Sequence, residues 1–286
     1  MREVEVHLLP AGLCRHPQAM TLRGGTWRPV AFPALATLLL HPVEGAILFD
    51  TGYDPAFARA TQPFPERFYR WLTPMQLPAG QDAASQCRAR GIDPADVRHV
   101  VLSHFHADHV AGLHAFPAAA IHCARAGLES ARHGGRWAAV CHGVLRGLLP
   151  PDLPARARCF EDAPRVALPR ATLPFTEGAD LLGDGSILAV ELPGHCPGHW
   201  GLLVADAQRG LHFLVADAAW SLEAIRRDVP PPALTTAFLG NTRNARETLA
   251  RLHALHTRNA EIEITPYHCP ERAAQALAAL PGAERA

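Results

Sequence analysis

The sequence predicts a protein of the α/β class, in which strands and helices alternate along the chain. Two apolar runs, residues 35–40 and 46–50, flank a short turn and indicate a β-hairpin. Residues 100–102 are apolar and β-branched, which is typical of a buried strand. Residues 241–256 carry leucines at helical spacing behind a capping Asn or Thr, so they predict an amphipathic helix.

The remaining elements follow from the same two periodicities, with glycine and proline marking their ends. Further strands are expected at residues 3–9, 98–102, 119–122, 186–192, 200–205, 210–217 and 261–265. Further helices are expected at residues 82–90, from residue 108 onward, and at 124–131, 137–149 and 271–280. Residues 150–180 are rich in proline and indicate a loop with short strands. No linker divides the chain, so residues 1–286 are predicted to form one domain.

Residues 54–80 combine prolines with large aromatic side chains. Long irregular segments inside compact domains often act as lids over a site. We therefore expect an apolar lid that lines a pocket for an acyl chain. A contact between the two copies of a homodimer, or ordinary core, is the alternative.

The composition narrows the class of protein. The 286 residues are 48% hydrophobic and 19% charged, so a substantial core is available. Lys plus Arg and Asp plus Glu both number 27, which gives no reason to expect nucleic acid or an anionic membrane as a partner. No Cys-x-x-Cys pair occurs, the first residues do not resemble a signal peptide, and no apolar segment is long enough to span a bilayer. These features predict a cytoplasmic protein.

Histidine and aspartate gather just after the strand at 98–102 and recur after later strands. The candidate metal donors are His104, His106, Asp108, His109, His195, Asp217 and His268. Neutral imidazole and carboxylate are the donors that zinc-type sites use. Because each candidate follows a predicted strand, one sheet edge can bring them together, and so many donors suit two metal ions that share a carboxylate. A histidine-rich surface turn at 104–109 is the alternative.

This pattern resembles the metallo-β-lactamase superfamily. The shared motifs are His-x-His-x-Asp-His at 104–109, Gly-His at 194–195, Ala-Asp at 216–217, the late His268, and the segments 49–52 and 193–199. Within the superfamily, the chain most resembles the N-acyl-homoserine lactone lactonases. The resemblance implies a four-layer αββα sandwich, the metallo-β-lactamase fold, in which two sheets lie between outer helices.

The resemblance also implies a role for each candidate donor. One metal ion would be bound by His104, His106 and His195. The other would be bound by Asp108, His109 and His268. Asp217 would bridge the two ions, Asp50 would orient ligands from behind, and His199 would support the site by hydrogen bonding. His106 stands where the iron-binding, oxygen-reducing branch has Glu, which favours two zinc ions, with iron, manganese or cobalt as alternatives.

The reaction expected from this resemblance is the opening of a lactone or related ester by a hydroxide that bridges two metal ions. Asp108 is expected to steer this hydroxide or to move a proton. A quorum-quenching lactonase acting on a small substrate with an apolar group is favoured. The alternatives are a glyoxalase II-like thioesterase, an aryl esterase or phosphotriesterase, and, outside enzymes, a signalling or binding protein that keeps the metal site.

Trp220 departs from the lactonase pattern. Lactonases of this type usually carry Tyr three residues after the bridging Asp, and an indole N–H cannot act as a phenol does. The lactone that fits is therefore left open, with Tyr267 as a candidate substitute phenol. The substrate pocket is predicted to include Phe105, Trp220, Phe64 and Phe68. Cys196 and Cys269 adjoin predicted ligands and are expected to be small buried residues rather than ligands.

Overall fold

The computed structural model describes residues 1–280. Its first seven strands are β1 (Glu3–Pro17), β2 (Pro29–His41), β3 (Gly45–Phe49), β4 (Met75–Gln76), β5 (His99–Val101), β6 (Ala120–Cys123) and β7 (Ala157–Cys159). The later strands are β8 (Arg165–Ala167), β9 (Glu177–Asp180), β10 (Ile187–Glu191), β11 (Trp200–Asp206), β12 (Gly210–Ala216) and β13 (Glu263–Pro266).

Helices connect these strands and cover their outer faces. The helices of the first half are α1 (Ala56–Ala60), α2 (Glu66–Leu72), α3 (Ala83–Ala89), α4 (Ala107–Val110), α5 (Arg125–Arg132) and α6 (Arg136–Cys141). Those of the second half are α7 (Leu153–Arg156), α8 (Leu222–Arg227), α9 (Ala233–Leu239), α10 (Thr242–Arg258) and α11 (Pro270–Ala278).

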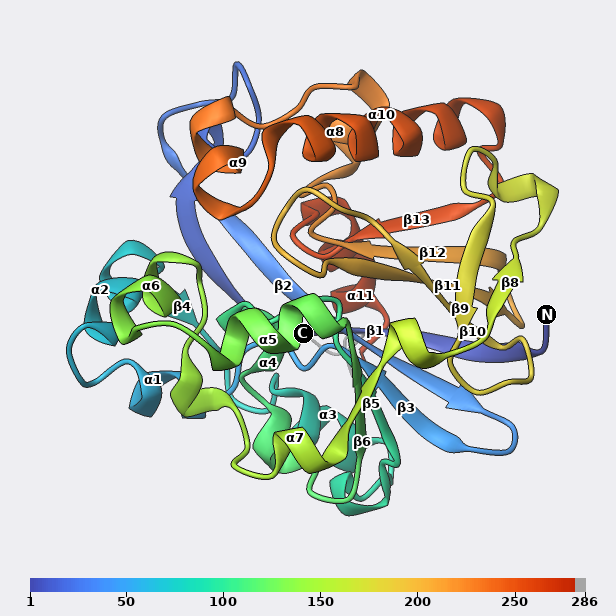
Figure 1. Ribbon diagram of the computed structural model, residues 1–286, viewed down its shortest axis with the longest axis horizontal. Coiled ribbons are helices and arrows are strands. Elements are labelled where there is room, and N and C mark those ends of the chain that lie inside the picture. Colours follow the sequence, from blue (N-terminus) through green and yellow to red (C-terminus); the bar gives the residue numbers. More distant parts are fainter. Residues whose placement is uncertain (281–286) are drawn as a thin grey trace.

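The strands form two arrays that join along one edge. The first runs in the order β7-β6-β5-β3-β2-β1, with β4 paired to β1, and the second in the order β8-β9-β10-β11-β12-β13. The start of β1 pairs in parallel with β11, at Glu3 and Ala205, and this contact joins the two arrays. Helices α8 and α10 lie over the second array, while α3, α4 and α7 lie on the far side of the first (Figure 1).

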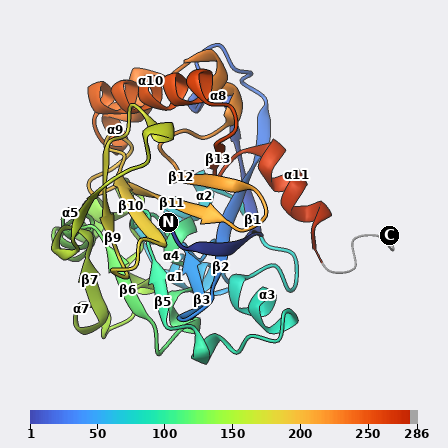
Figure 2. The ribbon, with the colours of Figure 1, turned by 90° about the vertical axis from the view of Figure 1, so that its right-hand side faces the viewer.

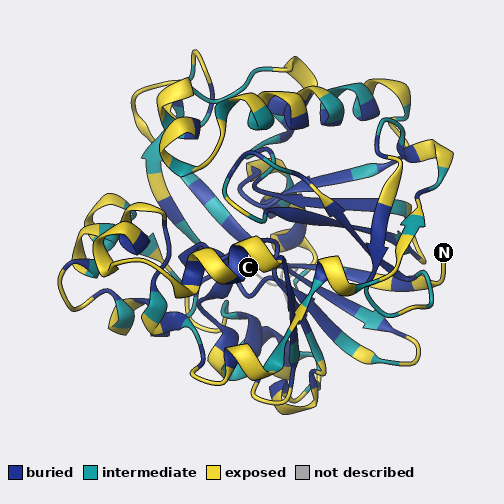
Figure 3. Cartoon of the chain, viewed as in Figure 1, coloured by how far each residue is buried: buried dark blue, intermediate teal, exposed yellow. Residues whose placement is uncertain are grey.

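Three apolar layers hold this arrangement together, and alternation along the strands builds them. On β2, Leu35 and Leu39 face the other sheet, whereas Leu38 faces the helices beneath the first sheet. On β12, Leu214 lies between the sheets and Phe213 lies under α8 and α10. Because successive side chains of a strand point to opposite faces, each central strand supplies two layers. The result is a four-layer αββα order, whose strands are largely buried and whose helices expose their outer faces (Figure 3).

Several predicted elements are confirmed. The hairpin forms between β2 and β3, with Leu38 opposite Leu48. Helix α3 begins after Asp82, whose carboxylate accepts a hydrogen bond from the backbone N–H of Ser85 at 2.8 Å. Helix α11 packs against the edge formed by β1 and β2 and projects from the side of the sandwich (Figure 2). Among residues 1–280, no helix combines the length and apolarity needed to cross a bilayer.

Other predicted elements are corrected. The helix expected at 137–149 ends at Cys141, because Gly143 turns the chain with a φ of 74°. The segment 54–80 is not irregular, since it contains α1, α2 and β4. Helices α8 and α9 were not predicted, and β1 extends to Pro17 rather than residue 9.

Candidate metal centre

All seven candidate donors lie at the carboxyl ends of strands. His104, His106, Asp108 and His109 follow β5, and the last two of these belong to the short helix α4. The other three follow β10, β12 and β13 as His195, Asp217 and His268. β12 and β13 run in parallel, as do β3 and β5, so their ends reach the same side of the sandwich. All seven residues are buried.

The donor atoms form three sets, and within each set they lie within 4.8 Å of one another. The sets are His104, His106, His195 and Cys196; His104, His109 and Asp217; and Asp108, His109 and His268. The first and third contain the trios that the family resemblance assigns to the two metal ions. The second contains Asp217 with one histidine of each trio, so this carboxylate lies between the two positions. Two adjacent cation sites with a shared carboxylate fit this geometry.

Asp50 orients two of the imidazoles. Its carboxylate accepts hydrogen bonds from the backbone N–H of Ser103 at 2.8 Å, from the Ser103 hydroxyl at 2.7 Å, and from Nδ1 of His109 at 2.8 Å. The Ser103 oxygen in turn lies 2.9 Å from Nδ1 of His104. Since Nδ1 of each ring is engaged, Nε2 of His104 and of His109 is left to face the centre.

Backbone carbonyls orient two further rings. Nδ1 of His268 donates to the Pro33 carbonyl at 2.7 Å, which directs Nε2 towards Asp217 at 3.1 Å. His199 lies behind the centre, where Nδ1 contacts the Leu192 carbonyl at 3.1 Å and Nε2 accepts from the Asp217 backbone N–H at 3.2 Å. His199 thus supports the residue that carries the shared carboxylate.

Buried atoms without partners support the presence of cations. Among residues 1–280, six buried side-chain nitrogen or oxygen atoms lack a hydrogen-bond partner, and four of these belong to the centre. They are Nε2 of His104, His106 and His109, and Oδ1 of Asp217. Buried polar atoms are seldom left unsatisfied, because the desolvation cost is then uncompensated. Divalent cations at the centre would satisfy Nε2 of His104, Nε2 of His109 and Oδ1 of Asp217, whereas His106 approaches Nε2 of His195 through its other nitrogen, Nδ1, at 3.0 Å.

Burial keeps the three histidines of the first trio, His104, His106 and His195, neutral. It lowers the pKa of His104 and of His195 well below the usual value, and lowers the pKa of His106 to about 4. Only neutral imidazole has a lone pair to offer a metal ion. These three rings are therefore prepared to act as ligands at neutral pH.

Carboxylates raise the pKa of the two histidines of the second trio, His109 and His268. Burial would lower the pKa of His109, but the negative charges of Asp217 and Asp50 raise it well above the usual value. Burial would likewise lower the pKa of His268, yet Asp217 raises it to about 9. Asp217 thus attracts protons to the nitrogen atoms that would bind a cation, so cation binding has to release them.

Two residues beside the centre adopt left-handed backbone conformations. Asp50 has a φ of 57° and Ala216 a φ of 44°, and neither is a glycine. Such conformations are unfavourable for side chains with a Cβ and tend to occur at functional sites. Ala216 lies where the register of β12 and β13 shifts, and the turn it makes directs Asp217 into the centre.

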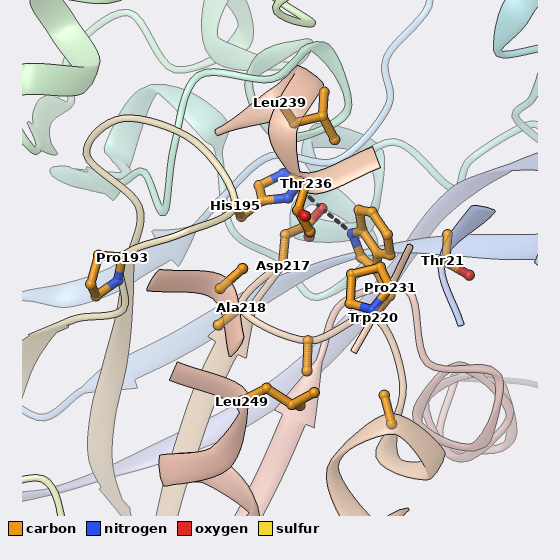
Figure 4. A pocket seen from close by; sticks show the side chains of 13 residues that line it. Thr21, Pro193, His195, Asp217, Ala218, Trp220, Pro231, Thr236, Leu239 and Leu249 are labelled. Atoms are coloured by element: carbon orange, nitrogen blue, oxygen red, sulfur yellow. Dashed lines mark hydrogen bonds and ion pairs between the residues drawn. The ribbon is translucent and has the colours of Figure 1, made fainter. Parts of the chain in front are cut away.

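A small cavity opens beside the centre. Its volume is about 30 Å³, and its lining includes His195, Asp217 and Trp220 together with Thr236 and Leu239 of α9 (Figure 4). A single water molecule needs only about 10–15 Å³ of such space, but an acylated substrate needs far more and has to extend beyond the cavity. The indole N–H of Trp220 donates to Oδ2 of Asp217 at 2.9 Å, so Trp220 contacts the shared carboxylate as well as lining the cavity.

Of the four aromatic residues expected in the pocket, Trp220 lines this cavity and the three phenylalanines do not. The Phe105 ring is buried in the core, where a Cβ on Gly127 would lie 3.1 Å from it, and its place in a substrate pocket stays a prediction. Phe64 and Phe68 are exposed by 58% and 36%, and on the surface Phe64 meets Trp137 edge to face while Phe68 packs against it at a tilt. They do not line the cavity, and a lid role for residues 54–80 stays a prediction.

Tyr267 cannot replace the missing phenol in this conformation. Its hydroxyl contacts the Thr37 hydroxyl at 2.6 Å and donates to the Phe49 carbonyl at 3.3 Å, so it points into the core between the sheets. Its ring instead stacks parallel to His109, at a centroid distance of 6.2 Å. Sequence reasoning also missed the contribution of Ser103, although its position directly before His104 offered a signal.

The sequence model of the metallo-beta-lactamase superfamily matches residues 30–258. The chain belongs to the metallo-β-lactamase superfamily. The predicted family and the predicted metallo-β-lactamase fold are thereby confirmed.

Relatives within the metallo-β-lactamase superfamily include named lactonases. The N-acyl homoserine lactonase AttM of Azorhizobium caulinodans is 26% identical over 269 residues, which cover 93% of each chain. An N-acyl homoserine lactonase of a Bacillus species is 24% identical over 226 residues, which cover 79% of this chain and 80% of the relative. These relatives support the prediction of a metal-dependent hydrolase.

Solved structures show the same fold. One is an N-acyl homoserine lactone hydrolase with the product N-hexanoyl-L-homoserine bound at the catalytic metal centre; it has a TM-score of 0.73 at 21% identity and covers 96% of this chain and 97% of its own. Another is AidC, a dizinc quorum-quenching lactonase, with a TM-score of 0.63 at 14% identity and coverage of 94% and 89%. At these identities the likeness establishes the fold of this superfamily member.

Proposed function

We propose that this protein is a hydrolase that opens the ring of an N-acyl homoserine lactone, or of a related ester, at a centre of two divalent cations. The observation that carries the proposal is the pair of donor trios joined by Asp217 beside a cavity. The lactonase relatives favour a lactone over other esters. Zinc as the metal, a cytoplasmic location and a homodimer stay predictions.

When bound, two divalent cations would supply Lewis acidity and a hydroxide nucleophile at neutral pH. The residues of the chain place those cations and balance their charge. His104, His106 and His195 would hold one, while Asp108, His109 and His268 would hold the other. The negative charge of Asp217 lies between them, and Asp50 fixes the orientation of the rings behind it.

Asp108 is the carboxylate we assign to proton transfer. One of its oxygens lies 3.4 Å from Nε2 of His268 and the other 3.8 Å from Nε2 of His109. Its side chain is 11% exposed, against 3% for Asp217. Asp108 is thus the more accessible of the two central carboxylates, which suits a group that exchanges a proton with the substrate or with water.

Replacing Trp220 with phenylalanine tests the contact between the indole and the shared carboxylate. The variant keeps an aromatic wall but loses the N–H that donates to Asp217. A hydrogen bond to a charged group contributes about 1.5–3 kcal/mol, so we expect kcat/KM for lactones to fall about tenfold or more. Trp137→Phe, at an indole that is 52% exposed on α6, is the control and should leave kcat/KM unchanged. Equal kinetics for both variants would show that the Trp220 N–H has no role.

Metal analysis combined with a substrate panel tests the proposed function. Purified protein should contain divalent metal, and a chelator should abolish ring opening of N-acyl homoserine lactones and lower the melting temperature. Adding zinc back should restore both. Thioesters, aryl esters and phosphotriesters, assayed beside the lactones, would identify one of the alternative hydrolases if they were turned over faster. If chelation changed neither hydrolysis nor melting, the proposal would be wrong.

A further inference from the structure

Cys196 brings a sulfur atom to the first donor trio. It follows His195 in the segment between β10 and β11. Its sulfur and the ring nitrogens of His104, His106 and His195 all lie within 4.8 Å of one another. Four atoms in such a group can surround a single cation, and a cysteine sulfur is one of the common donors to zinc.

One of the neighbouring nitrogens independently indicates a ligand at this position. Nε2 of His104 is buried and has no hydrogen-bond partner, and Nδ1 of the same ring is engaged by the Ser103 hydroxyl. Nδ1 of His106 lies 3.0 Å from Nε2 of His195, so these two nitrogens approach each other closely. The three rings are therefore packed closely around one point, and the sulfur lies within reach of that point.

The second trio has no such sulfur. Its members are Asp108, His109 and His268, which offer one carboxylate and two imidazoles. Cys269 follows His268 in the chain as Cys196 follows His195, but its sulfur accepts a hydrogen bond from the Leu222 backbone N–H at 3.5 Å and belongs to no donor group. The two cation positions thus differ in chemistry, although the sequence places a cysteine beside a ligand at both.

We propose that the Cys196 sulfur is a further protein ligand, besides the shared Asp217 carboxylate, of the cation held by His104, His106 and His195. The inference rests on the proposed function only in requiring that a divalent cation binds there. On binding, the S–H bond breaks, a sulfur–metal bond forms, and the proton passes to the solvent. Three imidazoles and a thiolate favour thiophilic ions such as zinc, cobalt and cadmium over manganese. The position without sulfur has no such preference.

X-ray absorption of the zinc-loaded protein tests this directly. We expect a sulfur scatterer at about 2.3 Å from zinc besides nitrogen and oxygen scatterers at about 2.0–2.2 Å. The cobalt-loaded protein should also show a sulfur-to-cobalt charge-transfer band in the near ultraviolet. Cys196→Ser should lose the sulfur scatterer and the band, whereas Cys269→Ser, the matched control, should keep both.

The possible outcomes separate this inference from the proposed function. If the zinc-loaded wild type shows only nitrogen and oxygen scatterers and still hydrolyses lactones, the sulfur ligand is wrong and the proposed function stands. If Cys196→Ser does not fold, the X-ray absorption of the wild type alone decides. If the sulfur scatterer is present but no ester is hydrolysed, the sulfur ligand stands and the proposed function is wrong. A charge-transfer band that persists in Cys196→Ser would also contradict the inference.

Discussion

Replacing Asp217 with asparagine is expected to lower lactone hydrolysis by about 10²–10³-fold, the scale seen when one electrostatic stabiliser is removed from an active site. Its Oδ2 lies 3.1 Å from Nε2 of His268, and its Oδ1 lies 3.3 Å from Nε2 of His109. The amide keeps the shape but removes the negative charge between the two cation positions. We therefore expect metal analysis to show fewer than two cations per chain, together with the fall in kcat/KM.

The control for this variant is Asp206→Asn. Asp206 is also a buried aspartate at the end of a strand of the same sheet, but it only accepts a hydrogen bond from the Gln208 backbone N–H at 2.9 Å. The Asp206→Asn variant should therefore retain full metal content and activity. A protein that keeps two cations and wild-type turnover after Asp217→Asn would show that this carboxylate is not shared.

Most of the sandwich could be predicted from the sequence, because its layers depend on the short-range periodicity of apolar residues. Alternation on β2, with Leu35 and Leu39 facing one way and Leu38 the other, can be recognised without tertiary information. The candidate donors could be grouped for a related reason, since each follows a strand and strand ends meet at a sheet edge. Helices α8 and α9 were missed because they are short, with six and seven residues. A helix of fewer than two turns does not show a recognisable periodicity in its sequence.

The directions in which side chains point could not be predicted from the sequence. Tyr267 adjoins His268, and nothing local indicates that its hydroxyl turns to Thr37, 230 positions earlier on β2. Phe105 lies between two candidate ligands, yet its ring packs into the core against α5. Cys196 and Cys269 occupy equivalent positions beside ligands, and only the fold shows that one sulfur joins a donor group. These orientations depend on contacts between distant segments.

Gly143→Ala is expected to displace His106, although Gly143 is not itself a candidate metal ligand. Gly143 has a φ of 74°, and a Cβ at this position would lie 2.7 Å from Cδ2 of His106. The Gly143 carbonyl also accepts a hydrogen bond from the Ala107 backbone N–H at 3.1 Å, so the turn cannot move away freely. The imidazole therefore has to shift, and a displacement of about 1 Å in a catalytic centre can cost about 10²-fold in rate. We expect a loss of this size in kcat, with weaker cation binding in metal titrations.

Gly134→Ala separates this effect from backbone strain. Gly134 has a φ of 88°, but a Cβ there would have no atom within 4 Å. Both variants place alanine in a left-handed conformation, which costs roughly 1–2 kcal/mol, so both should lose stability in thermal unfolding, and Gly143→Ala should lose more because its methyl group also overlaps His106. Only Gly143→Ala should also lose cation affinity and turnover, because only there does the new methyl group meet His106. If both variants bound cations and turned over substrate equally, the position of His106 would be shown not to depend on the turn after α6.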